Sequence, residues 1–551
     1  MKILRRPLNT HNFSLVKKFS PIQLALKNLF NDSYNLTYGD YGHLLQYCAN
    51  HRLILQGKLL HARIVLFNFS VDNFLGSKLI NFYAKTGHIV HARKVFDEIP
   101  HRNIWSYNAM FIAYSCDDKP VETLRLFSSF VRNSSVSVKP DNFTLTCVLK
   151  ALSSLFSDGN LAREIHCYAL RRGFELDLFV VNPLITYYAR CNEFGMARKV
   201  FDLMRKRDLV SWNSMISGYS QGGCYEESLK LYKLLLDDKN LSPDGVTVAS
   251  VLQGCAQNRD LVQGVEVHKF AVEKNIKIDT LVCNSIIGMY AKCGSLDYAR
   301  ELFEKMSERD EVTYGCLISG YLAHGFVEKA MDLFRRMENP SLSTWNGVIS
   351  GLAQNNFHEI SIDLTREMQD WGFKPNSVTV ASVLSALSHF CNLNAGKQVH
   401  AYAIRNDLED NIYVVTGLID VYGKAGFLRG AQHVFDQSWH RSVMVWTAII
   451  AAHATNGDAN HALNLFDDML NHETQPDPVT LTAILTACAY SGDIDNAWKI
   501  LEDMHDNYGI QPLAEHYACI VGVLTQVGKE SEAEKFISKI PMVSSAKAVR
   551  C

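Results

Sequence analysis

Residues 79–96 have the sequence LINFYAKTGHIVHARKVF, and the repetition of this pattern decides the fold. Each copy has a tyrosine, a Gly or Asn four residues later, an Ala nine residues later and a Phe thirteen residues later. Self-similarity of this kind is the signature of repeat architectures. The four further copies are LITYYARCNEFGMARKVF (184–201), IIGMYAKCGSLDYARELF (286–303), LISGYLAHGFVEKAMDLF (317–334) and LIDVYGKAGFLRGAQHVF (418–435).

The spacing within each copy predicts two short helices that pack as a hairpin. Leu, Ile and Tyr recur at helical spacing in the first segment. A Gly in the left-handed conformation ends that helix, and Asn192 takes its place in the second copy. The small Ala lets the second helix approach the first, and the Phe closes the core between them. Each helix has only about three turns and is marginal alone in water, so we expect the hairpins to stack into a solenoid.

A second pattern recurs between the copies of the first and contains a histidine. Its segments are GKLLHA (57–62), AREIHCYA (162–169), GVEVHKFA (264–271) and GKQVHAYA (396–403). The steps between the histidines are 105, 102 and 132 residues, and the last step is about one short repeat longer than the others. The array therefore has a super-period of about three repeats. Side chains so far apart in a solenoid cannot share a metal ion, and we interpret the four histidines as packing residues: His61, His166, His268 and His400.

This organisation resembles the plant pentatricopeptide repeat (PPR) family, in the PLS subgroup that cycles a standard, a long and a short repeat. The resemblance covers about residues 38–545 and implies an all-α, right-handed superhelical solenoid of about fifteen helix-turn-helix repeats. Standard repeats open with WSYNAM (105–110), VSWNSM (210–215), STWNGV (343–348) or MVWTAI (444–449), and they close with Pro-Asp or Pro-Asn. The repeats are long 38–72, short 73–103, standard 104–141, long 142–177, short 178–208, standard 209–244, long 245–279, short 280–310, short 311–341, standard 342–376, long 377–411, short 412–442, standard 443–477, a long C-terminal variant 478–513 and a short C-terminal variant from 514 to about 545.

Tetratricopeptide repeats are the alternative of another class, because they share the Tyr, Gly, Ala and Phe framework and bind peptides. They do not share the three-repeat cycle or the Pro-Asp endings. In that case the chain would be a protein-interaction scaffold, and the polar residues named below would have no role in binding.

Composition and motifs exclude several other classes. The formal net charge is −2, so an interpretation as a nucleic-acid binder cannot rest on bulk charge. No run of 18 apolar residues occurs, and we expect no membrane span. No His-x-Glu with Pro-Cys-x-x-Cys occurs, so the zinc deaminase constellation is missing. The sequence has neither a phosphate loop nor a nucleophile elbow. We therefore predict that the protein is not an enzyme and has no catalytic residues, metal site or cofactor. We also expect it to be a monomer.

The two ends of the chain differ from the array. Residues 1–31 carry six basic residues and no acid, which resembles an organelle transit peptide. We assign residues 1–37 to this leader and expect import into the mitochondrion, with the chloroplast as the alternative. Without residues 1–31, 49 basic residues remain against 57 acidic ones, so the array is acidic. Residues 546–551 resemble only the start of the C-terminal extension of editing factors in this subgroup, whose complete E extension and DYW deaminase domain we do not find here.

The resemblance implies which positions contact RNA. In this family one single-stranded base is recognised per helical repeat by two or three side chains. The fifth residue of a repeat and its last residue face the base edge, and amides, hydroxyls and carboxylates there meet Watson–Crick edges. The predicted pairs are Ser77 with Asn103, Asn108 with Asp141, Asn182 with Asp208, Asn213 with Asp244, Asn284 with Asp310, Asn346 with Asn376, Thr416 with Ser442, and Thr447 with Asp477.

The second residue of each repeat is expected to pack against the face of a base, so that neighbouring repeats sandwich it. Base stacking on aromatic side chains contributes about 1–3 kcal/mol per base. The predicted sandwich residues are Phe74, Trp105, Phe179, Val210, Leu281, Val312 and Met444.

The family's code then gives a partial target, x-A-U-x-U-U-x-U-x-Y-x-x-G, from 5′ to 3′. Asn with Asp implies uracil, Asn346 with Asn376 a pyrimidine, Ser77 with Asn103 adenine, and Thr447 with Asp477 guanine. The long repeats and the repeat that contains Gly315 give no assignment. The structural alternative is that an Asn or Thr, and the closing Asp, only cap helices.

These observations predict sequence-specific binding of single-stranded organellar RNA. Site recognition for cytidine-to-uridine editing, with a deaminase or editing-complex protein acting in trans, is the favoured role. Intron splicing or transcript stabilisation is the alternative.

Overall fold

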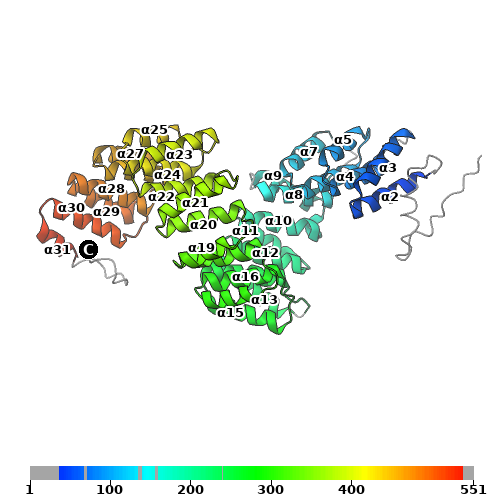
Figure 1. The fold of residues 1–551 in the computed structure, drawn as a ribbon, viewed down its shortest axis with the longest axis horizontal. Helices are drawn as coiled ribbons and strands as arrows, with labels where there is room; N and C mark the ends of the chain where they lie inside the picture. Colours follow the sequence, from blue (N-terminus) through cyan, green and yellow to red (C-terminus); the bar gives the residue numbers. More distant parts are fainter. Residues whose placement is uncertain (1–35, 68–70, 134–138, 156–158, 239, 538–551) are drawn as a thin grey trace, which may run out of the picture. The chain divides into compact units, whose positions relative to one another are not determined.

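The computed structural model describes residues 36–67, 71–133, 139–155, 159–238 and 240–537. Most of the predicted leader and the segment 546–551 lie outside these residues. Within them all regular structure is helical, with thirty α-helices and one short 3-10 helix (Figure 1). The prediction of an all-α protein built from helix-turn-helix repeats is confirmed.

The chain divides into two compact halves, residues 1–289 and 290–551, and α16 (Thr280–Lys292) crosses the border. The N-terminal half further contains α2 (Tyr38–His51), α3 (Ile54–Leu66), α4 (Asn73–Lys85), α5 (Ile89–Glu98), α6 (Ile104–Cys116), α7 (Pro120–Asn133), α8 (Asn142–Leu155), α9 (Gly159–Arg171), the 3-10 helix η3 (Phe174–Leu176), α10 (Leu178–Arg190), α11 (Phe194–Leu203), α12 (Leu209–Gln221), α13 (Tyr225–Asp237), α14 (Gly245–Asn258) and α15 (Leu261–Glu273). The C-terminal half contains α17 (Leu296–Lys305), α18 (Glu311–Ala323), α19 (Val327–Arg335), α20 (Leu342–Gln354), α21 (His358–Asp370), α22 (Ser377–Ser388), α23 (Leu393–Arg405), α24 (Ile412–Lys424), α25 (Leu428–Gln437), α26 (Val443–Thr455), α27 (Ala459–Asn471), α28 (Pro478–Ser491), α29 (Ile494–Asp506), α30 (Ala514–Gln526) and α31 (Glu530–Ile537).

Even-numbered helices are the first helices of the hairpins, and odd-numbered helices are the second ones. Each first helix begins at the first residue of a repeat recognised in the sequence, from Tyr38 to Ala514. First helices form a continuous layer within each half: α4, for example, packs against α2 and α6 as well as against its own second helix α5. Second helices pack on this layer from one side, as α7 does on α6 and α8.

The short repeats have the hairpin geometry that their pattern predicts. The residue between their two helices has a positive φ in all five copies, including +60° at Asn192. The Ala and Phe of the second helix are buried, as in Ala92 and Phe96, which are 0% and 2% exposed. The cap and the core contact predicted from the sequence are therefore confirmed.

The recurring histidines of the long repeats hold neighbouring hairpins together. The Nδ1 atom of His61 lies 2.8 Å from the hydroxyl of Tyr83, in the first helix of the following short repeat. His166 makes the same contact with Tyr188, as does His400 with Tyr422, each at 2.9 Å. These histidines are packing residues, as the sequence indicates.

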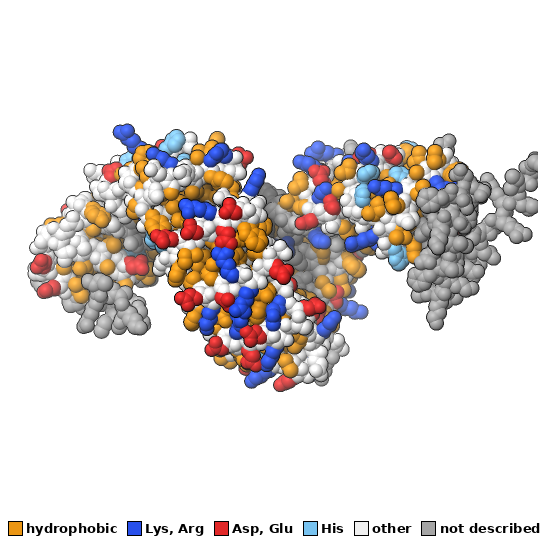
Figure 2. Space-filling model, in the orientation of Figure 1, with side chains coloured by type: hydrophobic (Ala, Val, Ile, Leu, Met, Phe, Trp, Pro, Cys, Tyr) orange, Lys and Arg blue, Asp and Glu red, His pale blue; other side chains and the backbone are white. Residues whose placement is uncertain are grey.

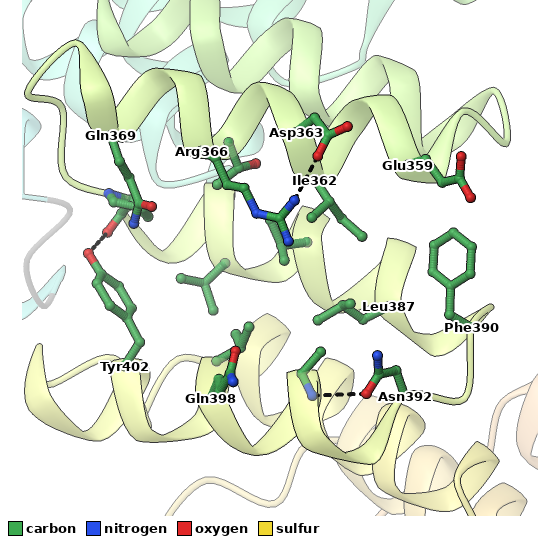
Figure 3. A pocket seen from close by; sticks show the side chains of 16 residues that line it. Glu359, Ile362, Asp363, Arg366, Gln369, Leu387, Phe390, Asn392, Gln398 and Tyr402 are labelled. Carbon is green, nitrogen blue, oxygen red and sulfur yellow. Dashed lines mark hydrogen bonds and ion pairs between the residues drawn. The ribbon is translucent and has the colours of Figure 1, made fainter.

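One second-helix junction in the C-terminal half contains a pocket of about 590 Å³, between α21 and α23 (Figure 3). Three standard repeats have an aromatic residue at the middle of the second helix, at Phe127, Tyr232 and Phe466, where the repeat 342–376 has Thr365. Tyr232 fills the corresponding junction by packing edge-on against Phe270, with 6.2 Å between ring centroids. Thr365 has a smaller side chain than these aromatic residues and lines the pocket.

No helix of the described part of the chain is long and apolar enough to cross a membrane. Basic and acidic side chains are intermixed on the face shown in Figure 2.

Candidate nucleic-acid interface

The second residues of the repeats form a row of exposed apolar side chains on the first helices. The seven residues predicted from the sequence are between 45% and 69% exposed, from Phe74 and Met444 to Trp105. Large apolar side chains are usually buried in a folded protein. Their repeated exposure at one helical position indicates a surface that contacts a ligand.

The structure extends this row to positions that the sequence analysis did not name. They occupy the same second position, mostly in the long repeats, and are similarly exposed. The repeat boundaries alone would have identified them, because each directly follows the first residue of a first helix. The additional residues are Phe143, Val246, Val378, Tyr413 and Val479.

The second residue of one repeat lies beside the fifth residue of the repeat before it. A Cβ atom added to Gly42, a fifth residue, would lie 2.7 Å from the ring of Phe74. In the same way, the hydroxyl of Thr146 donates to the backbone carbonyl of Phe179 at 2.6 Å. The apolar row and the predicted polar pairs are therefore neighbours on one face of the first-helix layer.

The fifth residues are less accessible than the sequence analysis expected. Asn213 is 9% exposed, and most of the other fifth residues named above are equally buried. The reason is their place in the seam between successive first helices, where the next repeat packs against them. The most buried are Asn108, Asn182, Asn284, Asn346 and Thr447, at 6–8%.

The predicted last residues other than Ser442 cap the first helix of the following repeat, which was the structural alternative. Asp244 accepts a hydrogen bond from the backbone N–H of Thr247 at 2.9 Å, and this carboxylate is the N-cap of α14. Asn103, Asp208, Asp310, Asn376 and Asp477 are N-caps of the same kind. Capping does not prevent contact with a base, since a carboxylate has two oxygens and the cap uses only one.

Fifth and last residues are joined directly in four repeats. The Nδ2 atom of Asn213 donates to Asp244 Oδ1 at 3.0 Å. The Nδ2 atom of Asn108 lies within reach of both oxygens of Asp141, at 3.0 Å from Oδ1 and 2.8 Å from Oδ2. The distance to Oδ1 is 3.3 Å in the pair Asn182 with Asp208 and 3.2 Å in the pair Asn346 with Asn376.

Three other predicted pairs, those of Ser77, Thr416 and Thr447, are not joined by a hydrogen bond between their side chains. The hydroxyl of Ser77 donates to the carbonyl of Asn73 within its own helix, and Thr416 likewise donates to Ile412. Thr447 contacts Thr480 at 2.6 Å and not Asp477.

Two carboxylates of the joined pairs, Asp208 and Asp244, stay ionised at neutral pH. Burial raises the pKa of Asp244, but hydrogen bonds from the backbone N–H of Thr247 and from Asn213 outweigh it, so the pKa lies below its usual value. The hydroxyl of Thr247 contributes as well, because it lies 2.9 Å from Asp244 Oδ1 and shares its one hydrogen between this oxygen and the nearer Asn213 Oδ1 at 2.6 Å. The pKa of Asp208 is lowered in the same manner, against its burial, by Ser211 and Asn182. Both side chains are therefore acceptors only.

A row of basic residues, which the sequence analysis missed, lies at the other end of the first helices. Lys85, Arg190, Lys292 and Lys424 each follow the recurring tyrosine by two residues. They are the thirteenth residues of short repeats, and eleven residues after the second position is about three full helical turns. The basic row and the apolar row thus share one face, about 16 Å apart along each helix.

The basic side chains reach toward the preceding long repeat. Lys85 donates to Asn50 at 2.9 Å, Arg190 to the carbonyl of Ser153 at 3.2 Å, and Lys424 to Ser388 at 3.2 Å. These contacts hold positive charge on the first-helix face of an otherwise acidic array. In the described part of the chain, no group of three His, Cys, Asp or Glu side chains is placed to hold a metal ion.

Comparison with known sequences agrees with this architecture. The model of the PPR repeat matches residues 77–104, 105–134, 179–209, 210–239, 281–310, 312–339, 413–441 and 479–508, and that of the PPR repeat family matches residues 340–389 and 441–490. Together they cover more than half of the chain. This chain belongs to the pentatricopeptide repeat family.

Curated pentatricopeptide repeat proteins of Arabidopsis thaliana are similar over nearly the whole chain. The pentatricopeptide repeat-containing protein At2g37310 is 55% identical over 96% of this chain and 81% of its own length. A second one, At1g11290, named chloroplastic, is 32% identical over 92% of this chain. The chain spans 58% of the length of that relative and 53% of another, At1g15510.

Among solved structures, the pentatricopeptide repeat protein PPR10 in complex with an 18-nt psaJ RNA element is similar, with 18% identity and a TM-score of 0.49. The match covers 94% of this chain and 76% of PPR10.

Proposed function

We propose that the protein binds single-stranded RNA along its first-helix face, with one nucleotide for each repeat. The observation that carries this proposal is a recurring juxtaposition. An exposed apolar second residue lies beside a polar pair whose outward atoms have hydrogen-bonding capacity left. Stacking would hold the face of each base, and the polar pair would meet its edge.

The hydrogen bonds of the pair Asn213 and Asp244 explain a preference for uracil. Asn213 Oδ1 accepts from Thr247, and Asn213 Nδ2 uses one hydrogen on Asp244 Oδ1. One N–H of the amide and the second carboxylate oxygen remain for the base. Uracil offers a carbonyl oxygen to the first and its N3–H to the second. Cytosine has a ring nitrogen acceptor at N3, which the carboxylate would repel.

The same argument about donors and acceptors predicts different base preferences for two other pairs. Asn376 Oδ1 accepts from the backbone of Thr379 and from Asn346, which leaves an amide N–H for the base. A donor at this place matches the N3 acceptor of cytosine better than the N3–H of uracil. In the repeat 443–477 the fifth residue, Thr447, is shorter than Asn and leaves room for a purine, while Asp477 accepts from the N–H groups of guanine.

The basic row supplies the contacts to the backbone. Phosphate contacts carry affinity without sequence information, and Lys85, Arg190, Lys292 and Lys424 lie on the proposed face. We therefore expect binding despite the net negative charge, with an affinity that falls as the salt concentration rises.

A gel-shift titration tests this proposal. The probe is a 13-nucleotide RNA with the pattern x-A-U-x-U-U-x-U-x-Y-x-x-G, compared with poly-A and with the same RNA carrying adenine at the four uracil positions. We expect the matched RNA to bind more tightly. Equal affinity for the matched RNA and for poly-A would overturn sequence-specific binding.

We further propose that the bound RNA is an organellar transcript and that the protein marks a site for cytidine-to-uridine editing, with the deaminase supplied in trans. The three-repeat cycle of the PLS subgroup supports this assignment. Sequencing of organellar RNA from plants that lack the protein should reveal one or a few unedited cytidines. Intact editing with unspliced or depleted transcripts would favour the splicing or stabilisation role.

The basic, acid-free residues 1–31 support import into the mitochondrion. Residues 1–60 fused to a fluorescent protein should label mitochondria in plant cells. Labelling of chloroplasts would favour the alternative organelle, and a cytosolic or nuclear signal would contradict import.

A further inference from the structure

A buried threonine follows each standard repeat and contacts its fifth residue. The hydroxyl of Thr144 donates to Asn108 Oδ1 at 2.7 Å, that of Thr247 to Asn213 Oδ1 at 2.6 Å, and that of Thr379 to Asn346 Oδ1 at 2.5 Å. In the last standard repeat, Thr480 lies 2.6 Å from the hydroxyl of Thr447. All four threonines are 0% exposed. Each is the third residue of the next long repeat, so the contact crosses a repeat boundary.

The short repeat 178–208 does not make this contact. Asn182 donates to Asp208 at 3.3 Å, but its own Oδ1 is buried without a hydrogen-bond partner, although Ser211 occupies the third position of the next repeat. Ser211 donates to Asp208 only. The same pair of residues, Asn and Asp, is thus held in two different ways.

In two other short repeats, the hydroxyl at the third position of the next repeat donates to the first residue of the short repeat and not to its fifth residue. Asn73 Oδ1 accepts from Ser106, and Glu311 Oε1 accepts from Thr344. The fifth residues of these repeats, Ser77 and Gly315, therefore have no link to the hydroxyl at the third position of the next repeat.

We propose that Thr144, Thr247, Thr379 and Thr480 are positioning residues, which hold the base-recognising fifth residue of each standard repeat in one orientation and so make these repeats more selective than the short repeat 178–208, whose amide oxygen has no hydrogen-bond partner. This inference rests on the proposed function, because it concerns how well a base is distinguished.

The physical reason is the fixed direction of the amide. The carboxylate of Asp244 at 3.0 Å requires the NH2 group of Asn213 to face it, since two oxygens at that distance would repel. The hydroxyl of Thr247 then satisfies the amide oxygen and holds the amide at both ends. The second N–H of the Asn213 amide is then fixed in one direction, toward the proposed position of the base. An amide held at one end only, such as that of Asn182, can tilt to meet more than one base edge.

The third residue of the long repeat acts through the fifth residue of the preceding standard repeat, so it need not contact the RNA itself. The side chain of Thr247 is completely buried and lies one helix beyond the repeat whose base it affects. A code based only on second, fifth and last residues therefore omits a determinant that belongs to the neighbouring repeat.

Thr247→Val tests the inference, because valine has nearly the same shape and lacks the hydroxyl. The full chain is titrated with RNAs that carry U or C opposite the repeat 209–244, and separately opposite the repeat 104–141. Loss of one hydrogen bond of typical net strength corresponds to about a two- to tenfold effect. We expect the ratio of U to C affinity to fall by this factor opposite 209–244 and to stay unchanged opposite 104–141. Thr247→Ser should retain the ratio.

A matched control is Thr344→Val, which removes a hydroxyl from the same position of a first helix. That hydroxyl contacts Glu311, and the fifth residue before it is Gly315, so no base preference should change. Equal loss of affinity for all RNAs in Thr247→Val, or an unchanged ratio, would overturn the positioning role. If the wild-type protein itself does not distinguish U from C opposite either repeat, the proposed function fails and not this inference.

Discussion

The adjacent repeats 178–208 and 209–244 carry the same pair of residues, Asn and Asp, at the positions proposed to contact a base, but hold it differently. In the first, Asn182 lies 3.3 Å from Asp208 and its amide oxygen has no hydrogen-bond partner. In the second, Asn213 lies 3.0 Å from Asp244 and its amide oxygen accepts from Thr247. The exposed second residues of the two repeats differ as well. The first repeat has Phe179, whose ring is near-parallel to that of Phe143 with 6.5 Å between the ring centroids, and the second repeat has Val210.

The difference separates two contributions to binding. An exposed aromatic ring stacks on any base, because every base has a π-face, and it adds affinity without selectivity. A polar pair with fixed donors and acceptors penalises the wrong edge and adds selectivity. We therefore expect the repeat 178–208 to contribute mainly affinity and the repeat 209–244 mainly discrimination, although a residue code assigns uracil to both.

The largest effect is expected from Asn213→Thr with Asp244 retained, which should change the preference of the repeat 209–244 from uracil to guanine. The pair Thr447 and Thr480 indicates that the seam accommodates a threonine at this place. A mismatch at one base costs about 1–3 kcal/mol, so the preference should shift by roughly ten- to hundredfold.

Competition between RNAs with U or G opposite this repeat measures the shift. Because Asn213 is buried in the seam and not freely exposed, the melting temperature is a necessary control. A variant that folds, binds RNA and still prefers uracil would contradict the assigned register.

The second prediction tests the stacking side of the comparison. Phe179→Ala should weaken binding to every RNA by roughly five- to hundredfold, as expected for the loss of one stacked base. The ratio between U and C opposite the repeat 178–208 should change little, because the edge contacts remain. Leu203→Ala removes another exposed apolar side chain of the same half, at the end of α11, and should leave binding unchanged. Base-dependent loss in Phe179→Ala would argue that the ring sets specificity.

The third prediction compares the two repeats without changing the protein. Replacing uracil by cytosine opposite the repeat 209–244 should cost near the upper end of the usual range of about 1–3 kcal/mol for a mismatch. The same replacement opposite the repeat 178–208 should cost near the lower end. Fluorescence anisotropy with four RNAs, which cover both single replacements and the double one, gives the two costs and their additivity. Equal costs would remove the distinction between the repeats.

The smallest effect is expected from pH. The pKa of Asp208 and that of Asp244 are lowered in the folded protein. Stability that comes from a depressed carboxylate pKa is fully present above the unfolded value of about 3.9 and is lost as the pH falls through the folded value. Uracil preference at both repeats should therefore be the same at pH 7 and pH 5.

Melting temperatures of the wild type and of Asp244→Ala between pH 7 and pH 3 provide the second part of this test. The variant lacks the cap of α14 and should melt lower at neutral pH, by an amount that corresponds to about 0.5–2 kcal/mol for a lost N-cap. The difference in melting temperature between the wild type and the variant should narrow only when the pH falls below the pKa of an aspartate in the unfolded chain. Narrowing already between pH 7 and pH 5 would mean that the carboxylate pKa is raised.

The sequence by itself determined the repeat boundaries, the hairpins and the row of second residues. Each depends on local periodicity: Gly or Asn four residues after a tyrosine ends a helix, and Ala and Phe at fixed spacing bury one face of the next. The exposed positions follow from the same register, and for this reason Phe143 and Tyr413 could have been named with Phe74 and Trp105. The basic residues at the thirteenth position were also readable from the aligned copies.

Only the tertiary structure decided how the polar pairs are held. Asn213 and Asp244 are 31 residues apart and Asn182 and Asp208 only 26, so the same two residue types meet across hairpins of different length. Whether a buried hydroxyl such as that of Thr247 reaches the amide depends on the separation of two helices to within a few tenths of an ångström. No periodic pattern encodes that separation, because it results from the packing of every side chain between the two helices.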